Sequence, residues 1–92
     1  MRMDEIGKDE GKSGKIGNID VAVYNGEDGT IVLDATCTHM GCIVSWNSIE
    51  KTWDCPCHGS RFKADGTVFA GPAVNPLNRI AFRMESGEII LD

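Results

Sequence analysis

Short runs of β-branched and aromatic residues alternate with polar residues along most of the chain. Turn dipeptides separate these runs, namely Asn25-Gly26, Asp28-Gly29, Asp65-Gly66 and Ser86-Gly87. The pattern predicts strands over Lys15–Ile19, Val21–Tyr24, Ile31–Thr36, Ile43–Trp46, Thr52–Asp54, Thr67–Phe69, Arg79–Met84 and Glu88–Leu91. No segment has the apolar period of a helix worth predicting. We therefore predict an all-β fold, a small antiparallel sandwich or barrel-like domain with its reactive residues on loops.

The first part of the chain differs from the rest. Residues 1–14 are rich in charge and glycine and have no apolar period, so we predict a flexible lead-in or linker there and one domain over residues 15–92. A chain of 92 residues buries only about 60–65% of its unfolded surface. A bound metal or a cross-link would therefore add useful stability.

The overall charge argues against nucleic-acid binding, and the hydropathy argues against a membrane-spanning segment. The net charge is −5 and the isoelectric point is about 4.8, which disfavours nucleic acid because such binding depends on clustered Lys and Arg. The longest apolar run, Val21–Tyr24, is far too short to span a membrane. The start of the chain also lacks the apolar segment of a secretory signal. We expect no membrane span in this chain and a cytoplasmic location.

All four cysteines and both histidines lie between positions 37 and 58, in the two motifs CTHMGC and CPCHGS. Each motif pairs a cysteine with a histidine at tight spacing, so one loop can aim two ligands at one metal centre. Two thiolates and two imidazoles suit tetrahedral zinc or a [2Fe–2S] cluster in which two histidines replace two cysteines. Zinc sites usually have Cys–Cys and His–His pairs at close spacing, whereas each motif here pairs one Cys with one His, which favours the cluster.

These residues carry a family resemblance. CTHMGC followed by CPCHGSRF resembles the two cluster-binding loops of Rieske [2Fe–2S] proteins that have an extra cysteine pair. The similarity continues through Trp46-Asn47, Thr52-Trp53-Asp54, Asp65-Gly66 and Gly71-Pro72-Ala73, and so covers about residues 15–92. That stretch is most similar to the C-terminal Rieske domain of FAD-dependent, amino-acid-dehydrogenase-like oxidoreductases.

The resemblance implies a role for each residue of the two motifs. Cys37 and Cys55 would bind one iron, and His39 and His58 would bind the other. Cys42 and Cys57 would form a disulfide, although a pair of buried thiols is the alternative in a reducing compartment. Histidine ligation raises the reduction potential to about −150 to +300 mV. Such a domain transfers single electrons and is not catalytic alone, and no nucleophile–base pair is visible.

The resemblance also implies three residues around the cluster, Ser60, Phe62 and Pro72. In quinol-oxidising relatives the serine of CHGS donates to a bridging sulfide, and a tyrosine two residues later donates to a cysteine sulfur. Ser60 keeps the first donor, but Phe62 lacks the second. We therefore predict a lower potential than in those relatives. Pro72 lies in a segment similar to the proline loop that covers the cluster.

The expected partner is a redox protein or a fused FAD-dependent oxidoreductase domain, which alone would carry the FAD. Two alternatives stay open. A soluble fragment of a quinol-oxidising cytochrome complex would share the extra cysteine pair, although such subunits normally have an N-terminal membrane anchor. A structural zinc module that binds a protein partner is the alternative from another class. Trp46 and Trp53 are expected to be core residues and not electron relays.

Overall fold

The computed structural model describes residues 1–39 and 41–92, so Met40 of the CTHMGC motif lies outside the described residues. Within these ranges a short 3-10 helix, η1 (Met3–Glu5), precedes nine strands. The strands are β1 (Glu10–Ile16), β2 (Ile19–Gly26), β3 (Gly29–Asp34), β4 (Ser45–Asn47), β5 (Thr52–Asp54), β6 (Arg61–Lys63), β7 (Val68–Ala70), β8 (Phe82–Glu85) and β9 (Glu88–Leu91). No helix in the described ranges is long and apolar enough to cross a membrane.

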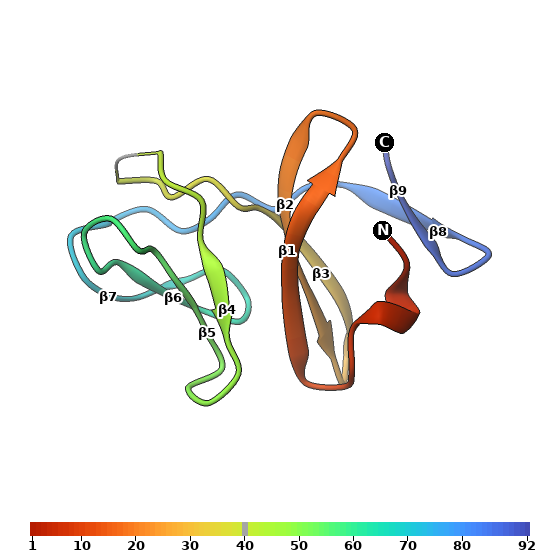
Figure 1. Ribbon diagram of the computed structural model, residues 1–92, viewed down its shortest axis with the longest axis horizontal. Helices are drawn as coiled ribbons and strands as arrows, with labels where there is room; N and C mark the ends of the chain where they lie inside the picture. The colour runs from red at the N-terminus through yellow and green to blue at the C-terminus, as the bar shows by residue number, and fades with distance from the viewer. Residues whose placement is uncertain (40) are drawn as a thin grey trace.

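The strands form three antiparallel sheets, and the predicted all-β fold is confirmed. The sheet β1-β2-β3 lies in the middle of the molecule, β4-β5-β6-β7 lies at one end, and the β8-β9 hairpin lies at the other (Figure 1). The connections that precede β4 and β6 meet at the outer end of the four-stranded sheet. Those connections contain the CTHMGC and CPCHGS motifs.

The middle sheet has a hydrophobic core on each face, because neighbouring residues of a strand point to opposite faces. In β2, Ala22 faces one core, and Val21 and Val23 face the other. The loop-side core is built by Ala22, Leu33, Ala35, Cys37, Val44, Trp53, Cys55, Phe62, Ala73 and Leu77. The hairpin-side core is built by Ile6, Val21, Val23, Val32 and Ile89. The two predicted thiolate ligands are therefore part of one core.

The middle sheet and the four-stranded sheet meet at a glycine. A Cβ on Gly11 of β1 would lie 2.8 Å from ring atoms of both Trp46 and Trp53, so only glycine fits there. The Trp46 indole also donates to the Glu10 carboxylate at 3.1 Å. Trp53 is fully buried, and its ring centroid lies 4.8 Å from that of Trp46. The two tryptophans thus join the sheets by packing.

Several strand boundaries differ from the sequence prediction. The strand predicted at Lys15–Ile19 is wrong, because Gly17 takes a positive φ of 62° and forms the turn between β1 and β2. The strand β1 instead begins at Glu10, within the predicted lead-in, and pairs with β2. The strand β1 was not predicted because it consists mostly of glycines and polar residues. The strand β6 was missed because Phe62 is its only apolar residue, whereas β5 and β9 have the predicted bounds.

Candidate metal centre

The two motifs fold into loops with the same backbone hydrogen bonds. In the first, Cys37 N–H donates to the carbonyl of Cys42 at 2.7 Å and Gly41 N–H donates to that of Cys37 at 3.0 Å. In the second, Cys55 N–H donates to Ser60 at 2.8 Å and Gly59 N–H to Cys55 at 3.3 Å. Gly41 and Gly59 both have φ of 79°, which glycine adopts at little cost. Each loop therefore presents its first cysteine from an equivalent position.

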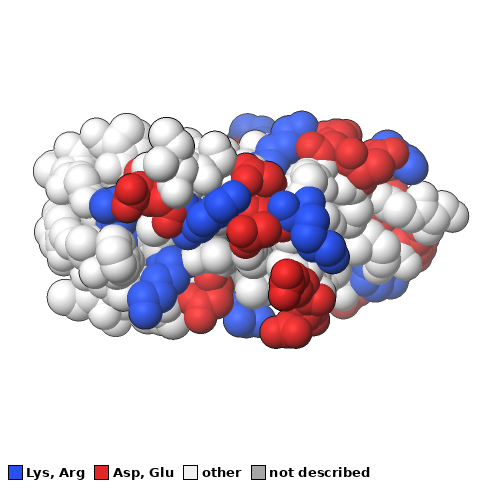
Figure 2. Space-filling model, turned by 90° about the horizontal axis from the view of Figure 1, so that it is seen from below, with Lys and Arg blue, Asp and Glu red and all other residues white. Residues whose placement is uncertain are grey.

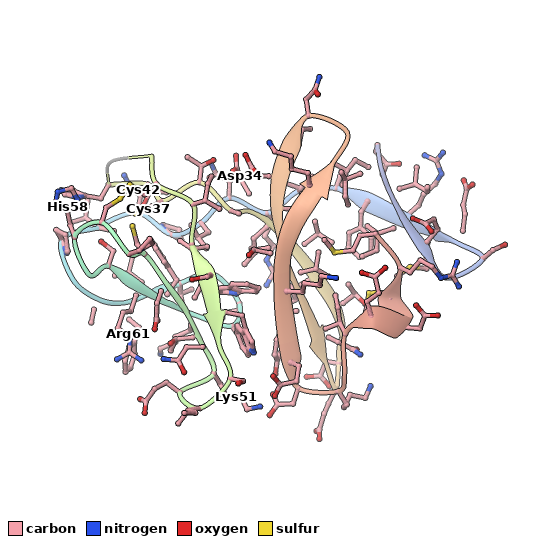
Figure 3. All side chains as sticks on the ribbon, viewed as in Figure 1. Asp34, Cys37, Cys42, Lys51, His58 and Arg61 are labelled. Carbon is pink, nitrogen blue, oxygen red and sulfur yellow. A yellow bond between two sulfur atoms is a disulfide. The ribbon has the colours of Figure 1, made fainter. Side chains whose placement is uncertain are left out.

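At this end of the molecule the two thiols are buried and the two imidazoles are exposed. Cys37 and Cys55 are buried, with 3% and 4% of their surface exposed, whereas His39 and His58 are exposed. The histidine ring centroids are 5.2 Å apart and the rings are nearly perpendicular. Figure 3 shows Cys37, Cys42 and His58 close together at the tip. The structure thus places Cys37 and His58 at the same end of the molecule and brings the two histidine rings together, with the thiols buried.

A disulfide between Cys42 and Cys57 joins the two loops, as the resemblance implied. It spans 15 residues, and closing such a loop is worth about 3 kcal/mol in the chain-entropy model. The sulfur atoms of Cys42, Cys55 and Cys57 lie within 4.8 Å of one another. Bonded disulfide sulfurs are not thiolate ligands, so this trio is not itself a metal site. The disulfide instead lies beside the buried thiol of Cys55.

A third loop packs against the second. A Cβ on Gly71, where φ is 97°, would lie 2.5 Å from Cα of Ser60, so the two backbones touch. The next residues include Pro72 and Ala73, and the Ala73 N–H donates to the buried Ser60 hydroxyl at 3.1 Å. Ser60 therefore anchors the loop that contains Gly71-Pro72-Ala73, the segment whose sequence resembles the proline loop. A hydroxyl that accepts this bond can also donate its own proton.

The third loop is also tied to the first. The Thr38 hydroxyl donates to the carbonyl of Asn75 at 2.6 Å. The bonds at Thr38 and Ser60 thus hold the third loop to both motif loops. Phe62 is fully buried and pairs with Trp53 across β5 and β6, so it packs beneath the second loop.

The loops at this end of the molecule carry no charged residue. Residues 35–49, 55–60 and 66–78 contain no Lys, Arg, Asp or Glu. Figure 2, which views the molecule from below, shows uncharged residues at the outermost part of this end, with the first charged residues a short way inward. Ile43 and Val74 are 41% and 84% exposed there. We call the exposed residues His39, Ile43, His58, Pro72 and Val74 the tip face.

An ion pair that was not predicted from the sequence borders the second loop. Asp54 precedes Cys55, Arg61 follows Ser60, and the Arg61 Nε lies 3.1 Å from the Asp54 carboxylate. Burial alone would raise the pKa of Asp54, but hydrogen bonds from Asn47, Thr52 and Arg61 lower its pKa below the usual range. The signal in the sequence was opposite charges on both sides of CPCHGS.

The donor set fits the implied group. Two buried sulfurs can take the inner metal position and two exposed imidazoles the outer one, as a [2Fe–2S] centre with mixed ligands requires. The β scaffold and this site define the class as a small iron–sulfur domain for electron transfer. The chain belongs to the Rieske [2Fe-2S] domain family, whose profile matches residues 1–81. Its cofactor is a Rieske-type [2Fe–2S] cluster.

Two relatives illustrate the membership. The Rieske 2Fe-2S iron-sulfur protein YhfW of Bacillus subtilis is 47% identical over 81 residues, which is 87% of this chain but 16% of that protein. The cytochrome b6-f complex iron-sulfur subunit of Synechococcus sp. (strain JA-3-3Ab) is 38% identical over 75% of this chain and 40% of its own length. The chain thus spans less than half of either protein.

A solved structure supports the same fold. The plasma membrane Rieske protein PetC3 of the cyanobacterium Synechocystis PCC 6803 superposes with a TM-score of 0.75 and 35% sequence identity. The match covers 87% of this chain and 83% of that one. The fold, the cofactor and the disulfide are therefore those that the sequence predicted.

Proposed function

We propose that Cys37 and Cys55 bind one iron of the cluster, that His39 and His58 bind the other, and that the chain passes single electrons through the histidine side. The observation that carries this proposal is the separation of buried thiols from a close pair of exposed imidazoles. When bound, the cluster supplies a one-electron redox centre. A ring nitrogen that is not bound to iron can contact a partner directly.

The protein residues around the site have separate tasks. The loop-side core keeps water from the two thiols, and the disulfide holds the two loops together. The tip face leaves the imidazoles accessible and offers apolar side chains to a docking protein. An electron would then leave at the contact between the histidines and that partner.

The experiment that tests this ligand set is metal analysis of the purified chain. We expect two irons and two sulfides per chain, and an EPR signal of low average g after reduction. His58→Ala should abolish the signal, whereas a Cys42→Ser/Cys57→Ser variant keeps all four ligands and should still bind iron. A colourless protein that contains zinc would overturn the proposal.

We further propose that the chain works as the electron-transfer part of a larger flavin-dependent oxidoreductase. The resemblance of residues 15–92 to domains fused to FAD-dependent enzymes supports this proposal. The relative that is 47% identical also supports it, because this chain covers only 16% of that protein's length and the rest of that protein must form other parts. Flavin analysis of the native protein, purified from its source, tests it: bound FAD that reduces the cluster is the expected result.

The second candidate is a subunit of a quinol-oxidising cytochrome complex. The 38% identity to a cytochrome b6-f iron-sulfur subunit favours it, whereas Phe62, without a hydroxyl, favours the flavin partner through the lower potential it predicts. Purification of the native protein together with a b-type cytochrome, and no flavin, would support this second candidate against the first.

A further inference from the structure

An ion pair borders the second ligand loop at both of its ends. Asp54 is the last residue of β5 and Arg61 the first of β6, and the two face each other as partners in the sheet. Between them, residues 55–60 form the loop and contain no charged side chain. The pair therefore supplies the first charges on either side of the loop.

The carboxylate of Asp54 is fixed in place by three donors. The Thr52 hydroxyl and the Arg61 Nε donate to one oxygen at 2.7 and 3.1 Å. The Asn47 amide donates to the other oxygen at 2.9 Å. Such a network holds a charge at one position, which an isolated surface pair does not.

The guanidinium of Arg61 is also held from several sides. Besides Asp54, it contacts the Thr52 hydroxyl at 3.1 Å and the Glu50 carboxylate at 3.6 Å. Its Cζ lies 5.3 Å from the centre of the Phe69 ring in β7. Figure 3 shows Arg61 on the four-stranded sheet, away from the tip. Arg61 thus connects the bases of the second and third loops.

We propose that Asp54 and Arg61 are an opposed pair of charges that sets the reduction potential of the site, Asp54 lowering it and Arg61 raising it. The inference rests on the proposed function. Reduction adds one electron, and so one negative charge, without making or breaking a bond. A fixed negative charge nearby disfavours that step and a fixed positive charge favours it. Both are positioning residues and touch no reacting atom.

The test is a redox titration, followed by EPR at one fixed pH, of the iron-loaded chain and its variants. Asp54→Asn should raise the potential and Arg61→Gln should lower it. The double variant should fall between the two single variants. Arg61→Lys keeps the charge and should stay closer to the unaltered chain than Arg61→Gln does. A purely structural role would loosen the loop in both single variants and shift both potentials in the same direction.

A matched ion pair at the far end of the molecule provides the control. Arg83 and Asp92 lie 3.0 Å apart, and the β8-β9 region is at the opposite end from the loops (Figure 1). Arg83→Gln and Asp92→Asn make the same charge changes and should leave the potential unchanged. Equal shifts in the control and test variants would overturn the inference.

Failure of the inference is distinguishable from failure of the proposed function. An unaltered chain without iron and sulfide would overturn the proposed function before any titration. A loaded chain whose two single variants shift in the same direction would overturn only the charge pair. If one single variant does not take up iron, the other single variant and the double variant still show in which direction each charge shifts the reduction potential.

Discussion

The two faces of the middle sheet bury similar strands but build different cores. The loop-side core contains Trp53, Phe62 and two cysteines whose thiols are expected to bind iron. Among the described residues, those buried in the hairpin-side core are aliphatic and come from the chain before β1, from β2 and β3, and from β9. The loop-side core is built from short strands and loops, and the hairpin-side core from longer strands and a hairpin. We therefore expect the loop-side half of the fold to depend on the metal more than the hairpin-side half does.

The largest expected effect separates the two halves. Cys37→Ser removes a proposed iron ligand from the loop-side core, so we expect complete loss of the cluster. Hydrogen exchange should then become faster in β4-β5-β6-β7, while β8 and β9 stay protected, because their core contains no ligand.

Ile89→Ala is the matched variant in the hairpin-side core. It should cost roughly 2–4 kcal/mol of unfolding free energy and leave the EPR signal of the reduced cluster unchanged. Faster exchange throughout the molecule in both variants would show that the two cores unfold as one unit.

The second effect concerns the contact between the third loop and Ser60. Gly71→Ala would place a Cβ 2.5 Å from Cα of Ser60, so the loop must move away. Gly17→Ala is the control, since Gly17 also has positive φ but has open space around it. A positive φ alone costs about 1–2 kcal/mol, and the overlap should add roughly 1–3 kcal/mol. Thermal unfolding of the two loaded variants measures the difference; equal losses would contradict the close contact.

The third effect tests the missing hydroxyl of the loop-side core. Phe62→Tyr should raise the reduction potential, because a new donor stabilises the more negative reduced cluster. One hydrogen bond of about 0.5–1.5 kcal/mol corresponds to roughly 20–60 mV for one electron. Redox titration measures the shift, with Phe82→Tyr in the remote hairpin as control. An unchanged or lower potential in the Phe62 variant would contradict the explanation.

The smallest effect lies where the two sheets meet. The Tyr24 hydroxyl donates to Asp9, and this bond raises the pKa of Tyr24 to about 12. Since Tyr24 is the only tyrosine in the chain, the absorbance of tyrosinate reports it directly. Below pH 10 this contribution to stability is complete, and it is lost as the pH rises toward 12. Asp9→Asn should shift the titration back toward pH 10; an unchanged titration would contradict the assigned cause.

Much of the site could be predicted from the sequence because metal ligation leaves fixed spacings in it. The two motifs contain all four cysteines and both histidines. The disulfide that the resemblance implied between Cys42 and Cys57 is confirmed. That Cys37, Cys55, His39 and His58 bind the iron stays a prediction, which the metal analysis tests.

The missed features depend on contacts between distant residues. Nothing local marks β1 as a strand, since Gly11 is favoured by the tryptophan rings packed on it. The bond from Thr38 to Asn75 joins residues 37 positions apart, beyond any motif. Similarly, β6 forms because β5 and β7 pair with both of its edges, although Arg61 and Lys63 give it little apolar character.

The uncharged tip face has a kinetic consequence. Without charge complementarity, association with a free protein partner proceeds at about 10⁵–10⁶ M⁻¹s⁻¹, and added salt changes that rate little. A covalent tether removes this limit, since a short flexible linker holds two sites at an effective concentration of about millimolar. If the proposed fusion to an oxidoreductase is correct, this docking surface gains more from the tether than it would from charge steering.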